Sequence, residues 1–278
     1  MRLIALPAAL LCALIASCAS APDLPAAQSL GTFNYRPDGN SSRTYYTVHR
    51  PQDAKVRPAV VIIHGGGWQR GEPSDMQTYV DRVVAEGWVA INMAYRLAPK
   101  HTWPAQKQDL YAALSSIHAN AQEYGLDPSR IAILGYSAGA HLAAVAALDS
   151  PPRLLPPVAW VGGAGPYDLT QYPQSKLVNA FLGGVPAAVG SSIYRDASPL
   201  LKVHSLAPPA YLWHGNWDLL VDQGQSERMA LALKAYNVPV VLRERTARGH
   251  LSNFLLGKDD WDDIATFLRP YLEPDPGT

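Results

Sequence analysis

The chain has 278 residues, of which 48% are hydrophobic and 17% charged, and its 23 basic residues are balanced by 23 acidic ones. This hydrophobic content excludes a wholly disordered chain, and the balanced charge argues against a nucleic-acid partner. Both cysteines, Cys12 and Cys18, lie in the first 18 residues, so the rest of the chain contains neither a disulfide framework nor a cysteine metal site.

The first residues predict an export signal. Arg2 precedes an apolar run over residues 3–16, a pattern typical of a secretory signal peptide. The run is shorter than the ~20 residues that span a bilayer, and Pro7 within it argues against the alternative of an uncleaved membrane anchor.

Residues 14–18, Leu-Ile-Ala-Ser-Cys, resemble a bacterial lipobox. The resemblance implies acylation of Cys18, attachment to the membrane through an N-terminal lipid anchor and, in a Gram-negative host, an outer-membrane destination. Ordinary signal cleavage after Ala21 is the alternative. We therefore predict a signal peptide over residues 1–17, a tether rich in Ala, Pro and Ser over 18–31, and one domain over 32–278.

Strand and helix patterns alternate along this domain. Apolar runs predict strands, and apolar residues at helical spacing predict helices. The predicted strands cover 45–49, 59–63, 88–94, 130–134, 158–162, 210–214 and 238–243, and the predicted helices cover 76–84, 105–124, 137–148, 226–235 and 261–271. This alternation predicts an α/β fold with a mainly parallel sheet covered by helices on both faces.

Residues 135–139 read Gly-Tyr-Ser-Ala-Gly and lie between a predicted strand and a predicted helix. In that context the G-x-S-x-G pattern predicts a nucleophilic Ser137 on a sharp turn, where bulkier neighbours than glycine would clash. The alternative is an ordinary strand–turn–helix junction with an incidental serine.

Residues 64–68 read His-Gly-Gly-Gly-Trp and follow another buried strand. Consecutive glycines allow peptide N–H groups to point into a site where negative charge develops on oxygen. A flexible hinge or a phosphate loop is the alternative, but no G-x-x-x-x-G-K pattern accompanies the glycines.

A nucleophilic serine needs a base. Three histidines follow Ser137 in the chain, namely His204, His214 and His250. His214 lies at a strand end and is better interpreted as a packed structural histidine. His250, which follows a glycine in the loop between the last predicted strand and the last predicted helix, is the predicted base.

The base needs an orienting acid. Asp218 follows the end of a predicted strand and is the predicted acid, with Asp222 and Asp168 as rivals. Any of these carboxylates can instead cap a turn or a helix.

These motifs resemble those of α/β-hydrolases in the acetyl-esterase and hormone-sensitive-lipase-like carboxylesterase group. The resemblance covers residues 45–272 and includes Tyr-Arg-Leu-Ala-Pro at 95–99 and the H-G-x-x-D element at 214–218. Two departures, Ala-Gly-Ala-His at 138–141 and Asp-Leu-Leu-Val at 218–221, lean toward the small lidless esterases that include feruloyl- and acetyl-xylan-type enzymes.

The resemblance implies that Ser137, His250 and Asp218 hydrolyse a small-molecule ester without a cofactor or metal. It also implies an oxyanion hole formed by the backbone N–H groups of Gly66, Gly67 and Ala138. Two alternatives stay open: an amide hydrolase of the arylformamidase type, and a non-catalytic lipoprotein with a hydrolase fold.

Aromatic residues flank the predicted site in the sequence. Trp68, Tyr136 and Trp217 are candidates for substrate contacts, whereas Tyr167 and Phe254 are as readily interpreted as core residues. Residues 169–208 form either a partial lid or ordinary surface structure. Because no long apolar lid is evident, short acyl chains are expected.

Overall fold

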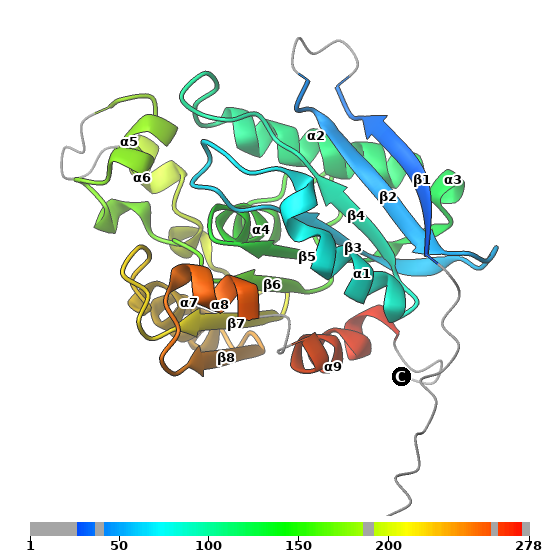
Figure 1. Cartoon of the computed structure of the whole chain (residues 1–278). Coiled ribbons are helices and arrows are strands. Elements are labelled where there is room, and N and C mark those ends of the chain that lie inside the picture. Colours follow the sequence, from blue (N-terminus) through cyan, green and yellow to red (C-terminus); the bar gives the residue numbers. More distant parts are fainter. Residues whose placement is uncertain (1–26, 37–41, 186–191, 257–260, 274–278) are drawn as a thin grey trace, which may run out of the picture.

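An eight-stranded sheet forms the centre of the part of the chain that the structure describes (Figure 1). This computed structural model describes residues 27–36, 42–185, 192–256 and 261–273. The strands lie in the order β1-β2-β4-β3-β5-β6-β7-β8; β1 and β2 pair antiparallel, β2 also pairs antiparallel with β4, and the other neighbours are parallel. Their bounds are β1 Ala27–Asn34, β2 Tyr45–Pro51, β3 Arg57–Ile63, β4 Val89–Met93, β5 Leu126–Tyr136, β6 Trp160–Gly163, β7 Ala210–Gly215 and β8 Val240–Arg245.

Helices cover both faces of this sheet (Figure 1). The α-helices are α1 Gln77–Ala85, α2 Ala105–Ala119, α3 Ala121–Tyr124, α4 Ala138–Leu148, α5 Lys176–Phe181, α6 Ser192–Asp196, α7 Gly224–Ala235, α8 His250–Leu256 and α9 Trp261–Leu272. The described residues also form the 3₁₀ helices η1 Pro73–Met76, η2 Leu169–Gln171 and η3 Pro199–Lys202. These bounds confirm the predicted α/β fold.

Alternate residues of β3 show how the two layers form. Val61 belongs to one buried cluster with Leu142 of α4, whereas its neighbour Val60 belongs to another with Val80 of α1 and Ile264 of α9. Successive side chains of a strand point to opposite faces of its sheet. An unbroken apolar strand therefore needs helices on both sides, as its sequence predicts.

Three predictions differ from the structure. Residues 27–31, assigned above to a tether, belong to β1, because Leu30 and Phe33 of this strand pack against the core. The helix predicted over 105–124 is divided at Asn120, whose side-chain amide donates to the Ser116 carbonyl. His250 begins helix α8 and does not lie in a loop.

The predicted signal peptide and Cys18 lie outside the described residues, and the lipid anchor stays a prediction. Among the residues that are described, no helix has the length and apolar character needed to cross a bilayer.

Candidate active site

Ser137 lies on a strained turn between β5 and α4. Its φ of 55° is positive, which is rare for a residue other than glycine. A Cβ at Gly135 would overlap the backbone of Gly139, and a Cβ at Gly139 would overlap the carbonyl oxygen of Ile63 in β3. Both glycines are therefore required for the close approach that lifts Ser137 above the sheet, as the G-x-S-x-G pattern predicts.

The structure brings Ser137 together with two residues that are distant in the sequence. Nε2 of His250, at the start of α8, lies 2.9 Å from Oγ of Ser137, and Nδ1 of His250 lies 2.6 Å from Oδ2 of Asp218. Ser137 and Asp218 are each 8% exposed. These contacts orient the imidazole so that Nδ1–H donates to the carboxylate and Nε2 accepts from the hydroxyl. This is the geometry of a nucleophile, base and acid triad.

The rival acids and base have other surroundings. Asp168 accepts from the N–H and hydroxyl of Thr170 and begins η2. Asp222 is exposed, with its carboxylate 3.7 Å from Arg228. His204 is also exposed, and its ring nitrogen accepts from the Leu206 N–H.

Asp218 is held in its ionised form. Burial alone would raise its pKa, but hydrogen bonds from His214, from His250 and from the backbone N–H of Val221 outweigh burial and hold the pKa well below its usual range. A carboxylate that is ionised at neutral pH can stabilise a positive charge on the neighbouring His250 ring.

His214 is the packed histidine predicted from the sequence, but its contact with the acid is a feature that the sequence did not reveal. The ring is fully buried, with Nδ1 2.8 Å from Oγ of Ser226 and Nε2 2.9 Å from the Val221 carbonyl. Nε2 also lies 3.3 Å from Oδ2 of Asp218. Its spacing of four residues before Asp218 is the only sequence signal of this contact.

The glycine loop after β3 lies against the turn that carries Ser137. A Cβ at Gly65 would lie 3.0 Å from the Tyr136 carbonyl and 3.4 Å from Cβ of Ser137. The backbone N–H groups of Gly66 and Gly67 donate to no other described residue. The N–H of Ala138 opens α4, where the first N–H groups of a helix have no partner within the helix. The loop and the helix start thus present backbone donors beside Ser137.

The side chain of His64 packs against this loop and hydrogen-bonds to it. Its Nδ1 lies 2.7 Å from the Gly65 carbonyl and its Nε2 lies 3.3 Å from Nη2 of Arg43, which also donates to the Gly71 carbonyl. The ring stacks on Tyr95, with 4.3 Å between centroids. Burial is the main cause that lowers the pKa of His64 to about 4, so the ring is neutral and its Nε2 is free to accept.

His141 plays a similar structural role beside Trp68. The Trp68 indole donates to Nδ1 of His141 at 3.3 Å, and Nε2 of His141 lies 2.7 Å from the Ala197 carbonyl. Only a neutral ring can make both hydrogen bonds, and burial lowers the pKa of His141 to about 4. Trp68 also stacks on Phe181, with 4.3 Å between centroids. These contacts explain why a histidine occupies position 141.

The lowered pKa values of His64 and His141 predict that the protein loses stability in mild acid. In the unfolded chain their pKa is near 6.5, and in the folded protein it is about 4, so below pH 6.5 the unfolded state binds protons more readily. Stability therefore falls as the pH falls from 6.5 towards 4, by about 2 kcal/mol per histidine between pH 7 and pH 5. Guanidinium unfolding at both pH values measures the loss.

His141→Gln provides the matched control, because a glutamine amide can accept from Trp68 and donate to Ala197 without titrating. The loss between pH 7 and pH 5 should be about 2 kcal/mol smaller in this variant than in the wild type. An equal loss in the variant and the wild type would contradict the assignment to His141.

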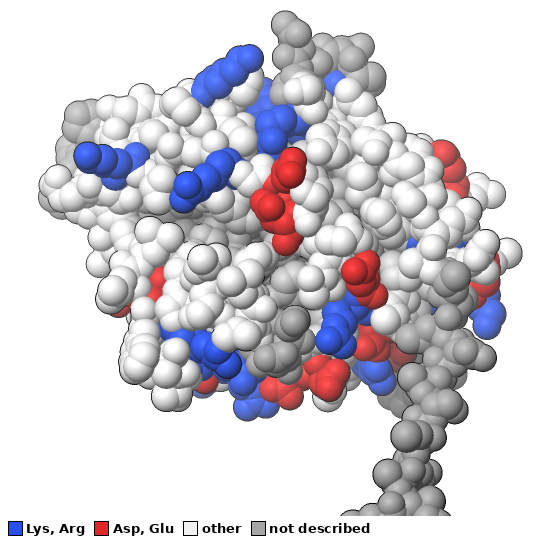
Figure 2. All heavy atoms as spheres, viewed as in Figure 1, with Lys and Arg blue, Asp and Glu red and all other residues white. Residues whose placement is uncertain are grey.

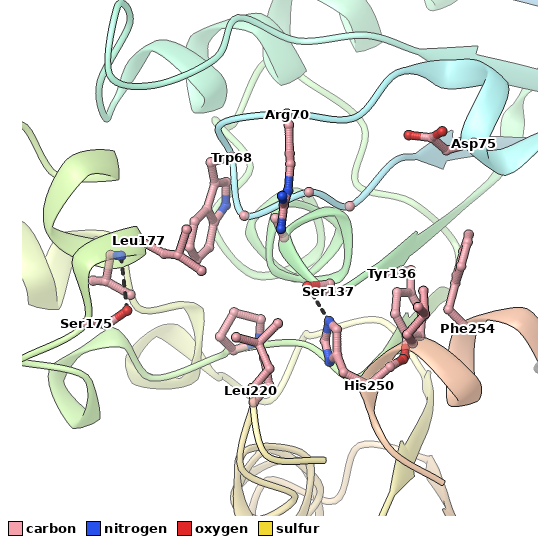
Figure 3. Close-up of a pocket in the computed structure, with 18 of the residues that line it drawn as sticks. Trp68, Arg70, Asp75, Tyr136, Ser137, Ser175, Leu177, Leu220, His250 and Phe254 are labelled. Atoms are coloured by element: carbon pink, nitrogen blue, oxygen red, sulfur yellow. Dashed lines mark hydrogen bonds between the residues drawn. The ribbon is translucent and has the colours of Figure 1, made fainter.

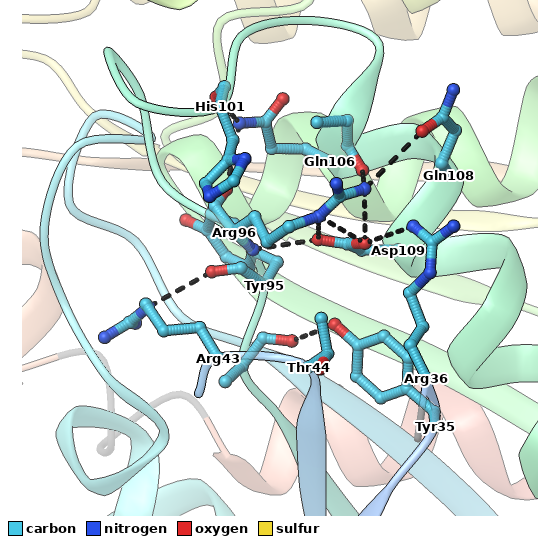
Figure 4. Close-up of polar contacts among 12 residues, drawn as sticks. Tyr35, Arg36, Arg43, Thr44, Tyr95, Arg96, His101, Gln106, Gln108 and Asp109 are labelled. Carbon is cyan, nitrogen blue, oxygen red and sulfur yellow. Dashed lines mark hydrogen bonds and ion pairs between the residues drawn. The ribbon is translucent and has the colours of Figure 1, made fainter. Parts of the chain in front are cut away.

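A cavity of about 530 Å³ opens above Ser137 and His250 (Figure 3). Trp68 and Tyr136 line it, as predicted, and so does Phe254. Tyr167 is fully buried in the core. Trp217 is 65% exposed and is not among the residues that line the cavity, and its role as a substrate contact stays a prediction. The segment predicted as a possible lid contributes one wall, formed by Tyr172, Ser175, Leu177 and Val178.

Among the described residues, no cluster of His, Cys, Asp and Glu could hold a metal ion.

Comparison with known proteins places this chain in a family. Esterase LipQ of Mycobacterium tuberculosis is 31% identical over 240 residues, which are 74% of this chain and 57% of LipQ. This chain therefore spans little more than half the length of that relative.

Two solved structures share the fold. A truncated carbohydrate esterase from gut microbiota superposes with a TM-score of 0.80 at 22% identity, covering 90% of this chain and 98% of that one. A bacterial heroin esterase superposes with a TM-score of 0.73 at 28% identity, covering 90% and 86%. The fold is that of the α/β-hydrolases. The BD-FAE family model matches residues 47–233, and the chain thus belongs to the BD-FAE family.

Proposed function

We propose that the protein is a serine carboxylesterase. The observation that carries this proposal is the continuous set of contacts from Asp218 through His250 to Ser137, which lies open to a cavity of about 530 Å³. The similarity to a protein named as an esterase, LipQ, supports the same chemistry.

The reaction begins with attack on the ester carbonyl. Oγ of Ser137 forms a bond to the carbonyl carbon while its proton passes to Nε2 of His250. The carbonyl oxygen becomes an oxyanion, which the backbone N–H groups of Gly66, Gly67 and Ala138 stabilise. Asp218 stabilises the histidine cation that forms.

Collapse of the tetrahedral intermediate completes the first half of the reaction, in which Ser137 is acylated. The bond from carbon to the leaving oxygen breaks, and His250 gives its proton to that oxygen to release the alcohol. A water molecule then attacks the acyl-enzyme and gives a proton to His250. The second collapse returns this proton to Oγ of Ser137 and releases the carboxylic acid.

The walls of the cavity favour aryl or short-chain acyl esters of the acetyl or feruloyl type. Trp68, Tyr136 and Phe254 supply aromatic surface, and Leu177 and Leu220 supply aliphatic surface. A volume of about 530 Å³ is within the range of pockets that bind drug-sized molecules, so the cavity holds an aryl group together with a short acyl chain.

A substrate panel tests the function and separates it from the alternatives. The purified protein is assayed with p-nitrophenyl acetate, phenyl acetate and N-formylkynurenine, and in parallel it is treated with a fluorophosphonate probe. A carboxylesterase hydrolyses the two esters and is labelled by the probe. Preference for N-formylkynurenine would favour an amide hydrolase, and failure of both ester hydrolysis and labelling would favour a non-catalytic binding protein.

Export and lipid attachment at Cys18 are a separate proposal, supported by the signal-like residues 1–17. They would place this esterase at a bacterial membrane.

A further inference from the structure

Nearly every polar side chain that lines the cavity has a partner within the protein. Ser137 and His250 contact each other. Two tyrosines are paired, because Tyr136 donates to the His250 carbonyl at 2.6 Å and Tyr172 accepts from the Asp222 N–H at 3.2 Å. Ser175 accepts from the Val178 N–H at 3.4 Å, and Asp75 accepts from the Glu72 N–H at 2.9 Å. The guanidinium of Arg70 differs, because it makes no hydrogen bond or ion pair with any described residue.

Arg70 is attached to the loop that carries the proposed oxyanion donors. Its backbone N–H donates to the Gly66 carbonyl at 3.1 Å. Figure 3 shows its side chain extending from this loop into the cavity, with the guanidinium above Ser137, whereas Asp75 lies well to one side. The backbone of Arg70 is therefore fixed to this loop, and its exposed guanidinium lines the same cavity as Ser137 without a partner among the described residues.

Asp75 is the one carboxylate among the described residues that line the cavity, and it makes no ion pair with Arg70. Figure 2 shows basic side chains on the upper left part of this face and acidic ones nearer its centre, where the two groups come close together. Apart from Arg70 and Asp75, the titratable residues described in the cavity lining are His250, Tyr136 and Tyr172, and most of the remaining lining is apolar. Arg70 is itself exposed, so its charge is open both to water and to a ligand that enters the cavity.

A guanidinium presents planar N–H donors that match the two oxygens of a carboxylate. We propose that Arg70 binds a carboxylate of the substrate, so that the enzyme prefers esters that carry a free carboxylate over neutral esters of the same shape. This inference rests on the proposed esterase function and names its substrate class.

Two matched pairs of esters test this preference, because the carboxylate can lie on either side of the ester bond. On the acyl side, mono-p-nitrophenyl glutarate is compared with p-nitrophenyl pentanoate. On the alcohol side, 4-acetoxybenzoate is compared with its methyl ester. The measured quantity is the ratio of kcat/KM for the anionic ester to kcat/KM for its neutral partner, at low and at high salt.

We expect Arg70→Gln to lower this ratio about 10-fold for at least one pair, mainly through KM, because a charge-assisted hydrogen bond is lost. Arg70→Lys keeps the charge and should retain part of the ratio. Arg82→Gln is the matched control, because Arg82 is an exposed arginine of α1 that does not line the cavity. High salt should lower the ratio in the wild type and have little effect on it in Arg70→Gln.

An unchanged ratio in Arg70→Gln for both pairs would overturn the proposal, as would an equal fall in Arg82→Gln. If the wild type hydrolysed no member of either pair, the esterase function itself would fail. Calorimetric binding of monomethyl glutarate to the wild type and to Arg70→Gln would then decide the carboxylate site separately, and equal affinities would overturn it.

Discussion

Replacing Ser137 with alanine is expected to lower kcat for p-nitrophenyl acetate on the order of 10⁴- to 10⁶-fold. The hydroxyl that lies 2.9 Å from Nε2 of His250 is the only nucleophile in this set of contacts, and alanine leaves the base without a proton to accept. The residual rate would come from the oxyanion donors and from substrate binding. Steady-state kinetics and loss of labelling by a fluorophosphonate probe measure the effect.

Ser29→Ala is the control for this experiment. Ser29 is exposed on β1, so its replacement should change neither the rate nor the labelling. If Ser137→Ala kept its labelling and more than a tenth of its activity, another residue would be the nucleophile.

Replacing Gly66 with alanine should lower kcat by about 10²- to 10³-fold, the range that follows loss of an oxyanion-hole donor. Gly66 has a φ of +105°, and a Cβ there would overlap the carbonyl oxygen of Arg70. The loop must therefore move, which takes the N–H groups of Gly66 and Gly67 away from the oxyanion. The effect should appear in kcat more than in KM, because the donors act on charge that develops in the transition state.

Gly31→Ala separates this clash from backbone strain alone. Gly31 has a similar φ of +120°, but a Cβ at this position has no neighbour within 4 Å. This control should lose some free energy of unfolding and keep its kcat. A Gly66→Ala variant with wild-type kcat would show that the glycine loop does not supply the oxyanion donors.

Local sequence patterns were sufficient to predict the fold and the centre of the site. The apolar run of β3 predicts burial on both faces, and the glycines at 135 and 139 predict the turn that carries Ser137, since both are properties of neighbouring residues. For β1 the pattern was misleading. Its only apolar anchors, Leu30 and Phe33, are surrounded by small and polar residues, and pairing with β2 decides that they form a strand.

The remaining features of the candidate site depend on contacts between residues that are far apart in the chain. The sequence favours Asp218 over Asp222 only through its place after a strand and the H-G-x-x-D resemblance, whereas the 2.6 Å contact with His250 distinguishes the two directly. In the same way, the exposure of Trp217 depends on which segments pack beside it, as does the lack of a partner for the Arg70 guanidinium among the described residues. Periodicity and glycine spacing report local backbone geometry, whereas the partner of a polar side chain is decided by the packing of the whole sheet.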